Sequence, residues 1–157
     1  MKSVATLIGV ISDTHGVLRP QALQTLKGAQ LILHAGDIGA PEVIAGLRAL
    51  APVTAVRGNC DRGPWAEAYP PMQRLVVDDV TILMLHDRHE LQPFAPGEEP
   101  QVVISGHSHQ PGVETRDGVL YLNPGSAGPR RFKLPVALAL LTVQGGKVTA
   151  EIVELAV

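Results

Sequence analysis

The stretch VATLIGVISDTH, residues 4–15, is a β-branched apolar segment that runs directly into an aspartate and a histidine. A near-continuous apolar run of this length is typical of a strand that is covered on both faces, as in a parallel sheet. Side chains that ionise or coordinate are costly to bury unless they are paired or bound to a metal. We therefore predict a buried strand that ends at a functional site.

The following residues continue the alternation of strand and helix. Pro20 and Pro41 each stand where a helix should begin, because proline is tolerated in the first helical turn. Short apolar runs at residues 31–34 and 53–56 follow the two predicted helices. The order β-α-β-α-β predicts that the first three strands are parallel.

The second half of the chain has the pattern of antiparallel hairpins. Pairs of apolar or alternating segments flank Asp78-Asp79, Asp117-Gly118 and Gly145-Gly146, and Asp-Gly and Gly-Gly are strong two-residue hairpin signals. A parallel α/β half joined to a strand-rich half predicts two mixed sheets packed face to face. Helices should flank them, because each sheet needs its outer face covered. The predicted class is α/β, or α+β in some schemes.

Length and composition limit the class of protein. The chain of 157 residues fits one domain, 1–157, and 45% hydrophobic residues with 18% charged residues are typical of a folded core. A net charge of -2 gives no electrostatic reason to bind extended nucleic acid.

Three further features bear on location. The apolar runs stay below the roughly 18 residues that span a bilayer, so we expect no membrane partner. An alternative reading of residues 4–11 as part of a secretory signal is disfavoured, because Ser12-Asp13-Thr14-His15 follows where small cleavage-site residues should stand. Cys60 is the only cysteine, which excludes an intramolecular disulfide. We expect a cytoplasmic protein, and the sequence leaves a homo-oligomer open.

Five short polar motifs follow apolar runs in a fixed order along the chain. Alone, each motif has an ordinary interpretation as a turn or a cap. Together they supply donors of the type that divalent metals bind, and several strands would deliver them to one point. In extended backbone, residues two apart point to one side, so Asp13 and His15 could chelate one ion, and His107 and His109 should share one side of their segment. The predicted metal ligands are Asp13, His15, Asp37, Asn59, His86, His107 and His109.

These motifs resemble those of the calcineurin-like metallophosphoesterase superfamily, which read D-x-H, G-D, G-N-H-[DE], H and G-H-x-H. The resemblance runs from near the N-terminus to Ser126, and Cys60 with the NPGS tail is most similar to the small YfcE-like phosphodiesterase branch. It implies a four-layer αββα sandwich of two mixed sheets. The chain carries the motifs as SDTHG at 12–16, AGD at 35–37, GNCD at 58–61, His86 and GHSH at 106–109.

The resemblance implies a divalent-metal-dependent phosphodiesterase that acts on small or activated phosphodiesters. A dinuclear centre and a metal-bridging hydroxide would carry out the hydrolysis. The mixed donors favour Mn, Fe, Ni or Zn over Ca or Mg, and we expect Mn. One ion would be held by Asp13, His15, Asp37 and His109, and the other by Asp37, Asn59, His86 and His107.

The same resemblance leaves other functions open. Within the enzymes, these are a phosphomonoesterase and a 2',3'-cyclic nucleotide phosphodiesterase. A different class is a non-catalytic scaffold for protein assembly, since the superfamily includes a retromer subunit. The retained ligands favour an enzyme with a small phosphoester substrate.

Four positions are expected to take part in catalysis, namely Asn59, Cys60, Asp61 and His86. Cys60 stands where the superfamily often has a histidine that protonates the leaving group. A thiol is a poorer proton relay at neutral pH, so we expect a preference for esters with good leaving groups. The alternative is that Cys60 only fills space. Asp61 should orient a neighbouring group or cap a turn.

Two other features of the sequence concern the surroundings of the site. His34 lies inside an apolar run and is expected in the core or behind the ligands rather than as a ligand itself. The Pro-rich segments 60–71 and 87–100 directly follow Asn59 and His86, and we expect them to wall the site.

Overall fold

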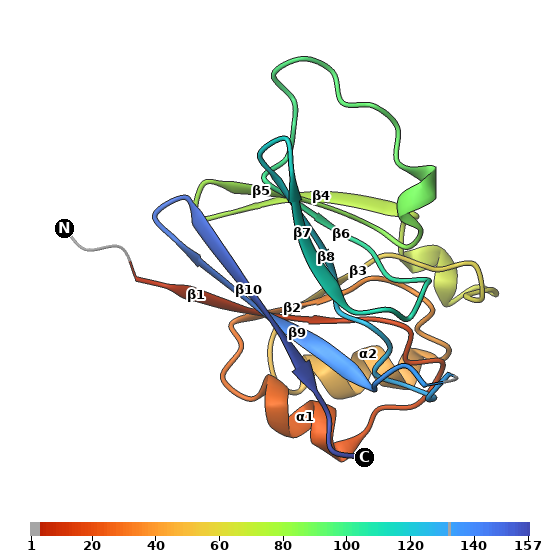
Figure 1. Cartoon of the computed structure of the whole chain (residues 1–157). Coiled ribbons are helices and arrows are strands. Elements are labelled where there is room, and N and C mark those ends of the chain that lie inside the picture. The colour runs from red at the N-terminus through yellow and green to blue at the C-terminus, as the bar shows by residue number, and fades with distance from the viewer. Residues whose placement is uncertain (1–3, 132) are drawn as a thin grey trace.

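The computed structural model describes residues 4–131 and 133–157 and has two five-stranded sheets packed face to face (Figure 1). The first sheet has the strand order β10-β9-β1-β2-β3, and the second has the order β4-β5-β6-β8-β7. Both sheets are mixed, which confirms the predicted class. The strands of the first sheet are β1 (Thr6–Ile11), β2 (Leu31–His34), β3 (Val53–Ala55), β9 (Ala137–Gln144) and β10 (Lys147–Glu154). Those of the second are β4 (Met72–Val77), β5 (Val80–Leu85), β6 (Val102–Ile104), β7 (Gly112–Arg116) and β8 (Val119–Asn123).

The parallel strands of each sheet end at the same edge. In the first sheet Ile11 pairs with His34, and His34 pairs with Ala55, so β1, β2 and β3 finish side by side. In the second sheet β5 and β6 are parallel, with Met84 beside Ile104. The loops that carry the polar motifs therefore leave both sheets at adjoining positions.

Two α-helices cover the outer face of the first sheet (Figure 1). Helix α1 (Pro20–Leu26) and helix α2 (Pro41–Arg48) both begin at the predicted prolines. Helix α2 buries Val43, Ile44 and Leu47. No helix in the described part of the chain is long and apolar enough to cross a membrane.

Three tight turns connect antiparallel neighbours as the sequence predicts. Asp78-Asp79 joins β4 to β5, Asp117-Gly118 joins β7 to β8, and Gly145-Gly146 joins β9 to β10. All six residues have positive φ, between 45° and 78°. Positive φ at both central positions gives the turn the twist of the flanking strands.

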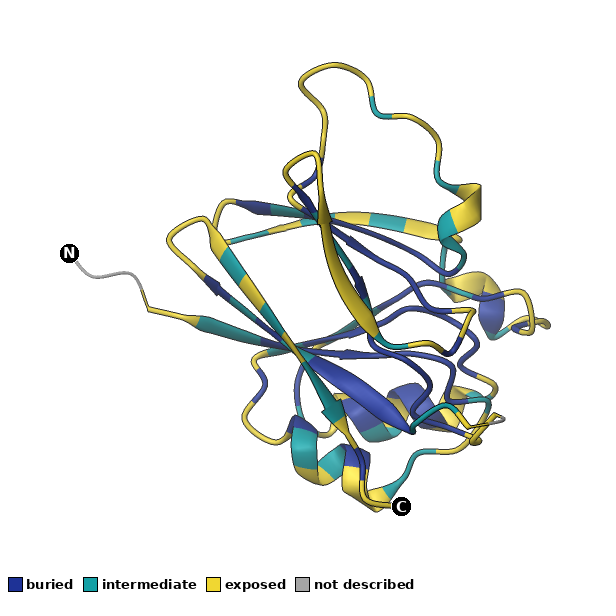
Figure 2. Cartoon of the chain, in the orientation of Figure 1, coloured by how far each residue is buried: buried dark blue, intermediate teal, exposed yellow. Residues whose placement is uncertain are grey.

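The main core is a cluster of buried residues from both sheets. Figure 2 shows β1, β5, β6 and β9 coloured largely as buried. Ile8 and Val10 of β1 meet Ile82 and Met84 of β5 in this cluster, and all four side chains are inaccessible to solvent. A second cluster joins the other face of β1, through Ile11, to the two helices. The prediction of a first strand buried on both faces is thus confirmed.

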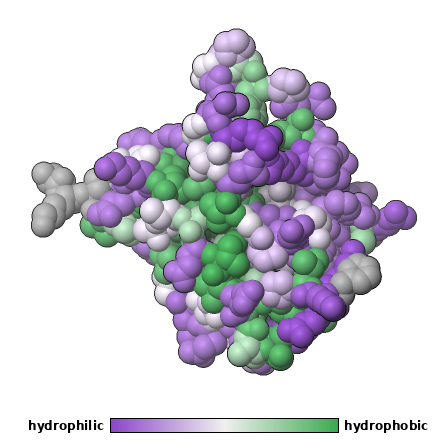
Figure 3. Space-filling model, viewed as in Figure 1, coloured by the Kyte–Doolittle hydropathy of each residue, from purple (hydrophilic) through white to green (hydrophobic). Residues whose placement is uncertain are grey.

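Figure 3 shows a mostly hydrophilic exterior, with hydrophobic side chains gathered near the middle of this face.

The outer layer over the second sheet differs from the expected layer of helices. In the described residues it consists of the one-turn 3-10 helix η2 (Arg88–Glu90) and the loop that follows it. Leu91 and Phe94 of this segment pack on Leu83 and Val103 of the sheet. Three prolines between 93 and 100 disfavour an α-helix there, because proline lacks the backbone N–H that a helix interior needs. A second 3-10 helix, η1 (Ala66–Ala68), lies in the loop between β3 and β4.

Candidate metal centre

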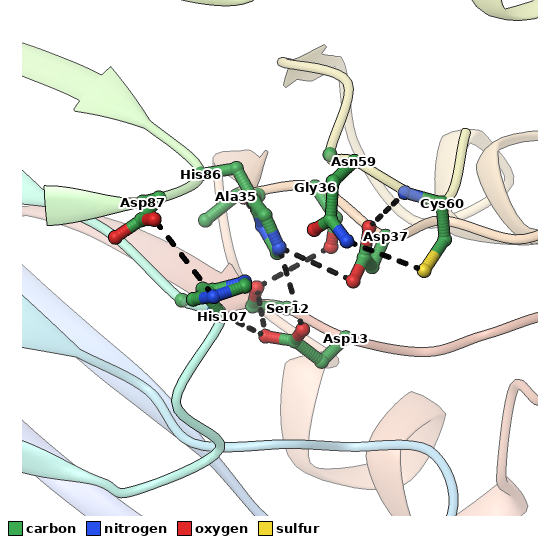
Figure 4. A network of polar contacts seen from close by, with 12 residues as sticks. Ser12, Asp13, Ala35, Gly36, Asp37, Asn59, Cys60, His86, Asp87 and His107 are labelled. Carbon is green, nitrogen blue, oxygen red and sulfur yellow. Dashed lines mark hydrogen bonds and ion pairs between the residues drawn. The ribbon is translucent and has the colours of Figure 1, made fainter. Parts of the chain in front are cut away.

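The polar motifs converge at the common edge of the two sheets (Figure 4). Asp13, Asp37 and Asn59 follow β1, β2 and β3 of the first sheet, while His86 and His107 follow β5 and β6 of the second. The sequence-based prediction that these loops meet is confirmed. The site is therefore built across the interface between the sheets.

Asp13 is fully buried and directs its two oxygens to different partners. Oδ2 accepts hydrogen bonds from Ser12 Oγ at 2.7 Å and from the backbone N–H of His107 at 3.1 Å. Oδ1 lies 3.3 Å from His109 Nε2, 3.8 Å from His86 Nε2 and 3.9 Å from His15 Nε2. One oxygen is thus fixed by the protein, and the other faces three imidazoles.

Asp37 has the same division of roles. Its Oδ1 accepts the backbone N–H of Cys60 at 2.9 Å, and its Oδ2 lies 3.2 Å from His86 Nε2 and 3.7 Å from His15 Nε2. Burial raises the pKa of Asp37, but the adjacent imidazole of His86 and the backbone N–H of Cys60 outweigh burial and hold this pKa well below its usual range. The carboxylate is therefore ionised at neutral pH.

His86 is oriented by the backbone of the neighbouring strand end. Its Nδ1 lies 2.8 Å from the carbonyl oxygen of Ala35, which can only accept a proton, so Nδ1 is the protonated nitrogen. Burial lowers the pKa of His86, but the neighbouring carboxylates of Asp37 and Asp13 outweigh burial and raise it. In the neutral imidazole the lone pair of Nε2 points toward the two aspartates, which is the arrangement of a metal-binding histidine.

Four buried side-chain atoms in the described residues lack a hydrogen-bond partner: Asp13 Oδ1, His15 Nε2, His86 Nε2 and His109 Nδ1. Buried polar atoms are nearly always satisfied, because an unpaired one costs about 1–3 kcal/mol. All four belong to residues predicted as metal ligands. Carboxylate and imidazole donors left free in this way fit divalent cations.

Three overlapping sets of residues have donor atoms within 4.8 Å of one another. They bring together all four residues expected to hold one ion, together with His86. Asn59 and His107 lie beside them, because both line a cavity of about 200 Å³ with His86. The three sets are Asp13, His15 and His109, then Asp13, Asp37 and His86, and finally His15, Asp37 and Cys60.

The backbone of the ligand motifs is not extended, so that part of the sequence analysis was wrong. Asp13 and His15 have φ of 55° and 47°, and His107 and His109 have φ of 70° and 63°. Asp37, at 55°, is left-handed as well. Residues other than glycine pay for this conformation, and such strain clusters at functional sites. Four of these residues supply donor atoms to the three sets, and His107 lines the cavity beside them.

Two glycines of the motifs allow the carboxylates to pack against backbone. A Cβ at Gly58 would overlap Asp37 Oδ1, and a Cβ at Gly106 would overlap Ser12 Oγ and approach Asp13 Oδ2. Glycine at these positions thus permits close backbone approach.

Asp61, which was expected among the catalytic residues, is buried and directs both carboxylate oxygens to backbone amides. Its carboxylate accepts the backbone N–H groups of Ile38 at 3.0 Å, Gly39 at 2.9 Å and Gly58 at 2.9 Å. It therefore ties the Asp37 loop to the Asn59 loop, which agrees with an orienting role.

His34 is fully buried behind the ligands. Its Nδ1 accepts the backbone N–H of Gly36 at 3.1 Å, and its Nε2 lies 2.9 Å from Thr14 Oγ1, which donates to the carbonyl of Ile38 at 2.8 Å. Burial is the main cause that lowers the pKa of His34 to about 4. Sequence reasoning missed Thr14 as its partner, because nothing in the local pattern marks a threonine that bonds across two strands.

Comparison with known proteins agrees with this geometry. The calcineurin-like phosphoesterase superfamily domain matches residues 7–146. The chain belongs to this family. A probable metallophosphoesterase of Methanothermobacter thermautotrophicus is 36% identical over 94% of this chain and 92% of its own length. Phosphodiesterase YfcE of Escherichia coli is 28% identical over 83% of this chain and 84% of its own.

The calcineurin-like fold is also shared with proteins of other names. Vacuolar Protein Sorting 29 from Cryptosporidium parvum superposes with a TM-score of 0.76 at 21% identity, covering 96% of this chain and 97% of its own. That likeness concerns the fold.

A larger cavity of about 590 Å³ adjoins the candidate metal centre. Asp87 and His107 line both this cavity and the smaller one. Arg88 stacks on the ring of Tyr121 at 4.1 Å and forms an ion pair of 3.5 Å with Glu114. The segment 87–100 thus contributes walls near the site, as predicted. The segment 60–71 contributes Pro71 to the smaller cavity.

Cys60 is exposed and lies at the rim of the centre. Burial, followed by the negative charge of Asp37, raises the pKa of its thiol. The metal-free protein therefore carries this side chain as a thiol at neutral pH.

Proposed function

We propose that this protein is a divalent-metal-dependent phosphodiesterase that hydrolyses small or activated phosphodiesters at a dinuclear centre. The observation that carries the proposal is a group of three buried atoms without hydrogen-bond partners, in which Asp13 Oδ1 lies 3.9 Å from His15 Nε2 and 3.8 Å from His86 Nε2. Such atoms are costly to bury unless a cation pairs with them. Membership of the calcineurin-like phosphoesterase family supports the class of reaction.

Two sets of four residues, which share Asp37, would hold the ions. The position of Asp37 Oδ2 between His15 and His86 supports this sharing. The mixture of carboxylate and imidazole donors suits Mn, our first choice, and also Fe, Ni or Zn. The first set is Asp13, His15, Asp37 and His109, and the second is Asp37, Asn59, His86 and His107.

Two divalent cations against two carboxylates leave about two net positive charges, which attract a phosphate and lower the pKa of a water molecule. The protein holds the ligand side chains in fixed orientations. Asp13 and Asp37 each have one oxygen held by a backbone N–H, so the other oxygen cannot turn freely. Ala35 holds His86 in the same way. Groups held in advance need little reorganisation during the reaction.

The two adjoining cavities favour a diester over a monoester. The smaller one is lined by Asn59, His86 and His107, and the larger one begins at His107 and Asp87. A phosphodiester has two substituents, and a phosphate at the centre would have space for one on each side. A phosphomonoester would leave the larger cavity unused.

The experiment is a metal-dependent assay on protein stripped with a chelator. We expect bis(4-nitrophenyl) phosphate to be hydrolysed after Mn is added and not before. Asp37→Ala should abolish the activity, since it removes the shared ligand. Glu151→Ala, an exposed position on β10, is the matched control and should behave like the parent.

A panel with 4-nitrophenyl phosphate and 2',3'-cyclic AMP separates the diesterase from the alternative enzymes. Faster turnover of either compound than of the diester would replace the substrate class proposed above. If no phosphoester is hydrolysed and Asp37→Ala binds metal as the parent does, the protein is a scaffold instead.

A further inference from the structure

Cys60 lies among the donors of the metal centre. Its Sγ is within 4.8 Å of donor atoms of both His15 and Asp37. The wider superfamily pattern has a histidine at this position, so a sulfur donor here is a departure from that pattern. Two neighbours hold the residue in place, because its backbone N–H donates to Asp37 Oδ1 at 2.9 Å and Asn59 Nδ2 lies 3.7 Å from the sulfur.

The other donors at this position are independent evidence for a cation there. His15 Nε2 is buried without a hydrogen-bond partner, and it lies 3.9 Å from Asp13 Oδ1, a fully buried atom that is also unpartnered. The sulfur lies within 4.8 Å of a donor atom of the same His15. A cation placed to satisfy them is therefore close to a thiol.

The separation suits shared coordination. Zinc binds sulfur at about 2.3 Å and nitrogen at about 2.0 Å, so two such donors on one ion are at most about 4.3 Å apart. The upper limit of 4.8 Å exceeds this by a distance that a small rotation of an exposed side chain covers.

We propose that Cys60 is a further metal ligand, whose sulfur binds the ion held by His15 and Asp37. The inference rests on the proposed function, because it needs an ion at this centre. On binding, the thiol releases its proton to solvent and the sulfur supplies the electron pair of the new bond. A sulfur donor raises the affinity for Zn and Co relative to Mn. A ligand of this kind donates no proton to a leaving group, which also agrees with a preference for good leaving groups.

The test uses Co²⁺ as a spectroscopic probe on stripped protein. Cobalt bound to nitrogen and oxygen donors gives visible ligand-field bands, and a thiolate ligand adds a charge-transfer band in the near ultraviolet. We expect both in the parent protein. Cys60→Ser should keep the visible bands and lose the near-ultraviolet band. Arg62→Ser, an exposed change two residues away, is the control and should keep both.

Each outcome decides between the two ideas. Visible bands without a near-ultraviolet band in the parent would overturn the role of Cys60 and leave the metal centre intact. A near-ultraviolet band that persists in Cys60→Ser would likewise overturn it. Absence of any cobalt spectrum would overturn the proposed metal centre together with this inference.

Discussion

Asp13 Oδ1 lies 3.8 Å from His86 Nε2, so a side chain that follows β1 of one sheet meets a side chain that follows β5 of the other. Neither atom has a hydrogen bond, and both are buried. A 3.8 Å separation is too long for a hydrogen bond but suits two ligands of one ion.

Asp13→Asn should remove metal-dependent stabilisation. A ligand at 100 times its Kd stabilises the folded state by about 2.7 kcal/mol, and the variant should lose most of this because a neutral amide is a weaker donor. The measurement is the melting temperature with and without Mn. An equal rise in parent and variant would contradict a ligand role for Asp13.

Cys60→His should improve turnover of esters with poor leaving groups, because an imidazole relays protons better at neutral pH. Turnover of 4-nitrophenyl esters should change little, since that leaving group needs no proton. A series of aryl phosphodiesters measures the effect as a shallower dependence of rate on leaving-group pKa. An unchanged dependence would count against the idea that this position limits proton transfer.

Gly58→Ala should disturb the metal centre, because its Cβ would overlap Asp37 Oδ1. Overpacking of this kind typically costs about 1–3 kcal/mol. Chemical denaturation and Mn titration would report both losses. Gly112→Ala is the control, since nothing lies within 4 Å of the Cβ it would add. Equal behaviour of the two variants would show that the packing around Asp37 adapts.

The left-handed backbone at His15 predicts an unusual order of stability. In metal-free protein His15→Gly should be more stable than His15→Ala by about 1 kcal/mol, because glycine adopts φ of 47° without strain. In extended backbone alanine would be the better replacement. Urea denaturation of the two variants distinguishes these cases.

Acid should destabilise the metal-free protein partly through His34. Burial lowers its pKa to about 4, against about 6.5 in the unfolded chain, so the unfolded chain binds more protons between these values. The free energy of unfolding should therefore fall as pH drops through this window, by about 3 kcal/mol at most. His34→Gln should show a weaker dependence in urea denaturation at pH 7 and pH 4. Parallel curves would assign the effect to other groups.

Much of the fold follows from local pattern. The apolar runs, the helix-starting prolines and the Asp117-Gly118 turn each determine an element through short-range sterics and burial. The convergence of the motif loops also followed, because parallel strands end at one edge.

The remaining features depend on contacts between distant residues. Asp13 and His109 adopt a left-handed conformation against local preference, and the backbone N–H of Asp13 is bound by the carbonyl of Gly36, more than twenty residues away. The direction of the Asp61 carboxylate is set by amides of the Asp37 loop more than twenty residues away. The absence of a helix in the segment over the second sheet could have been predicted from the sequence, since three prolines between 93 and 100 disfavour a helix there.

The position of the candidate centre across two sheets has a mechanical consequence. A cation between Asp13 and His109 would tie together segments that are far apart in the sequence, as a disulfide does in a secreted domain. With a single cysteine the protein has no such covalent link. The ion that serves the chemistry would then also cross-link the two sheets. Its removal should weaken the association of one sheet with the other.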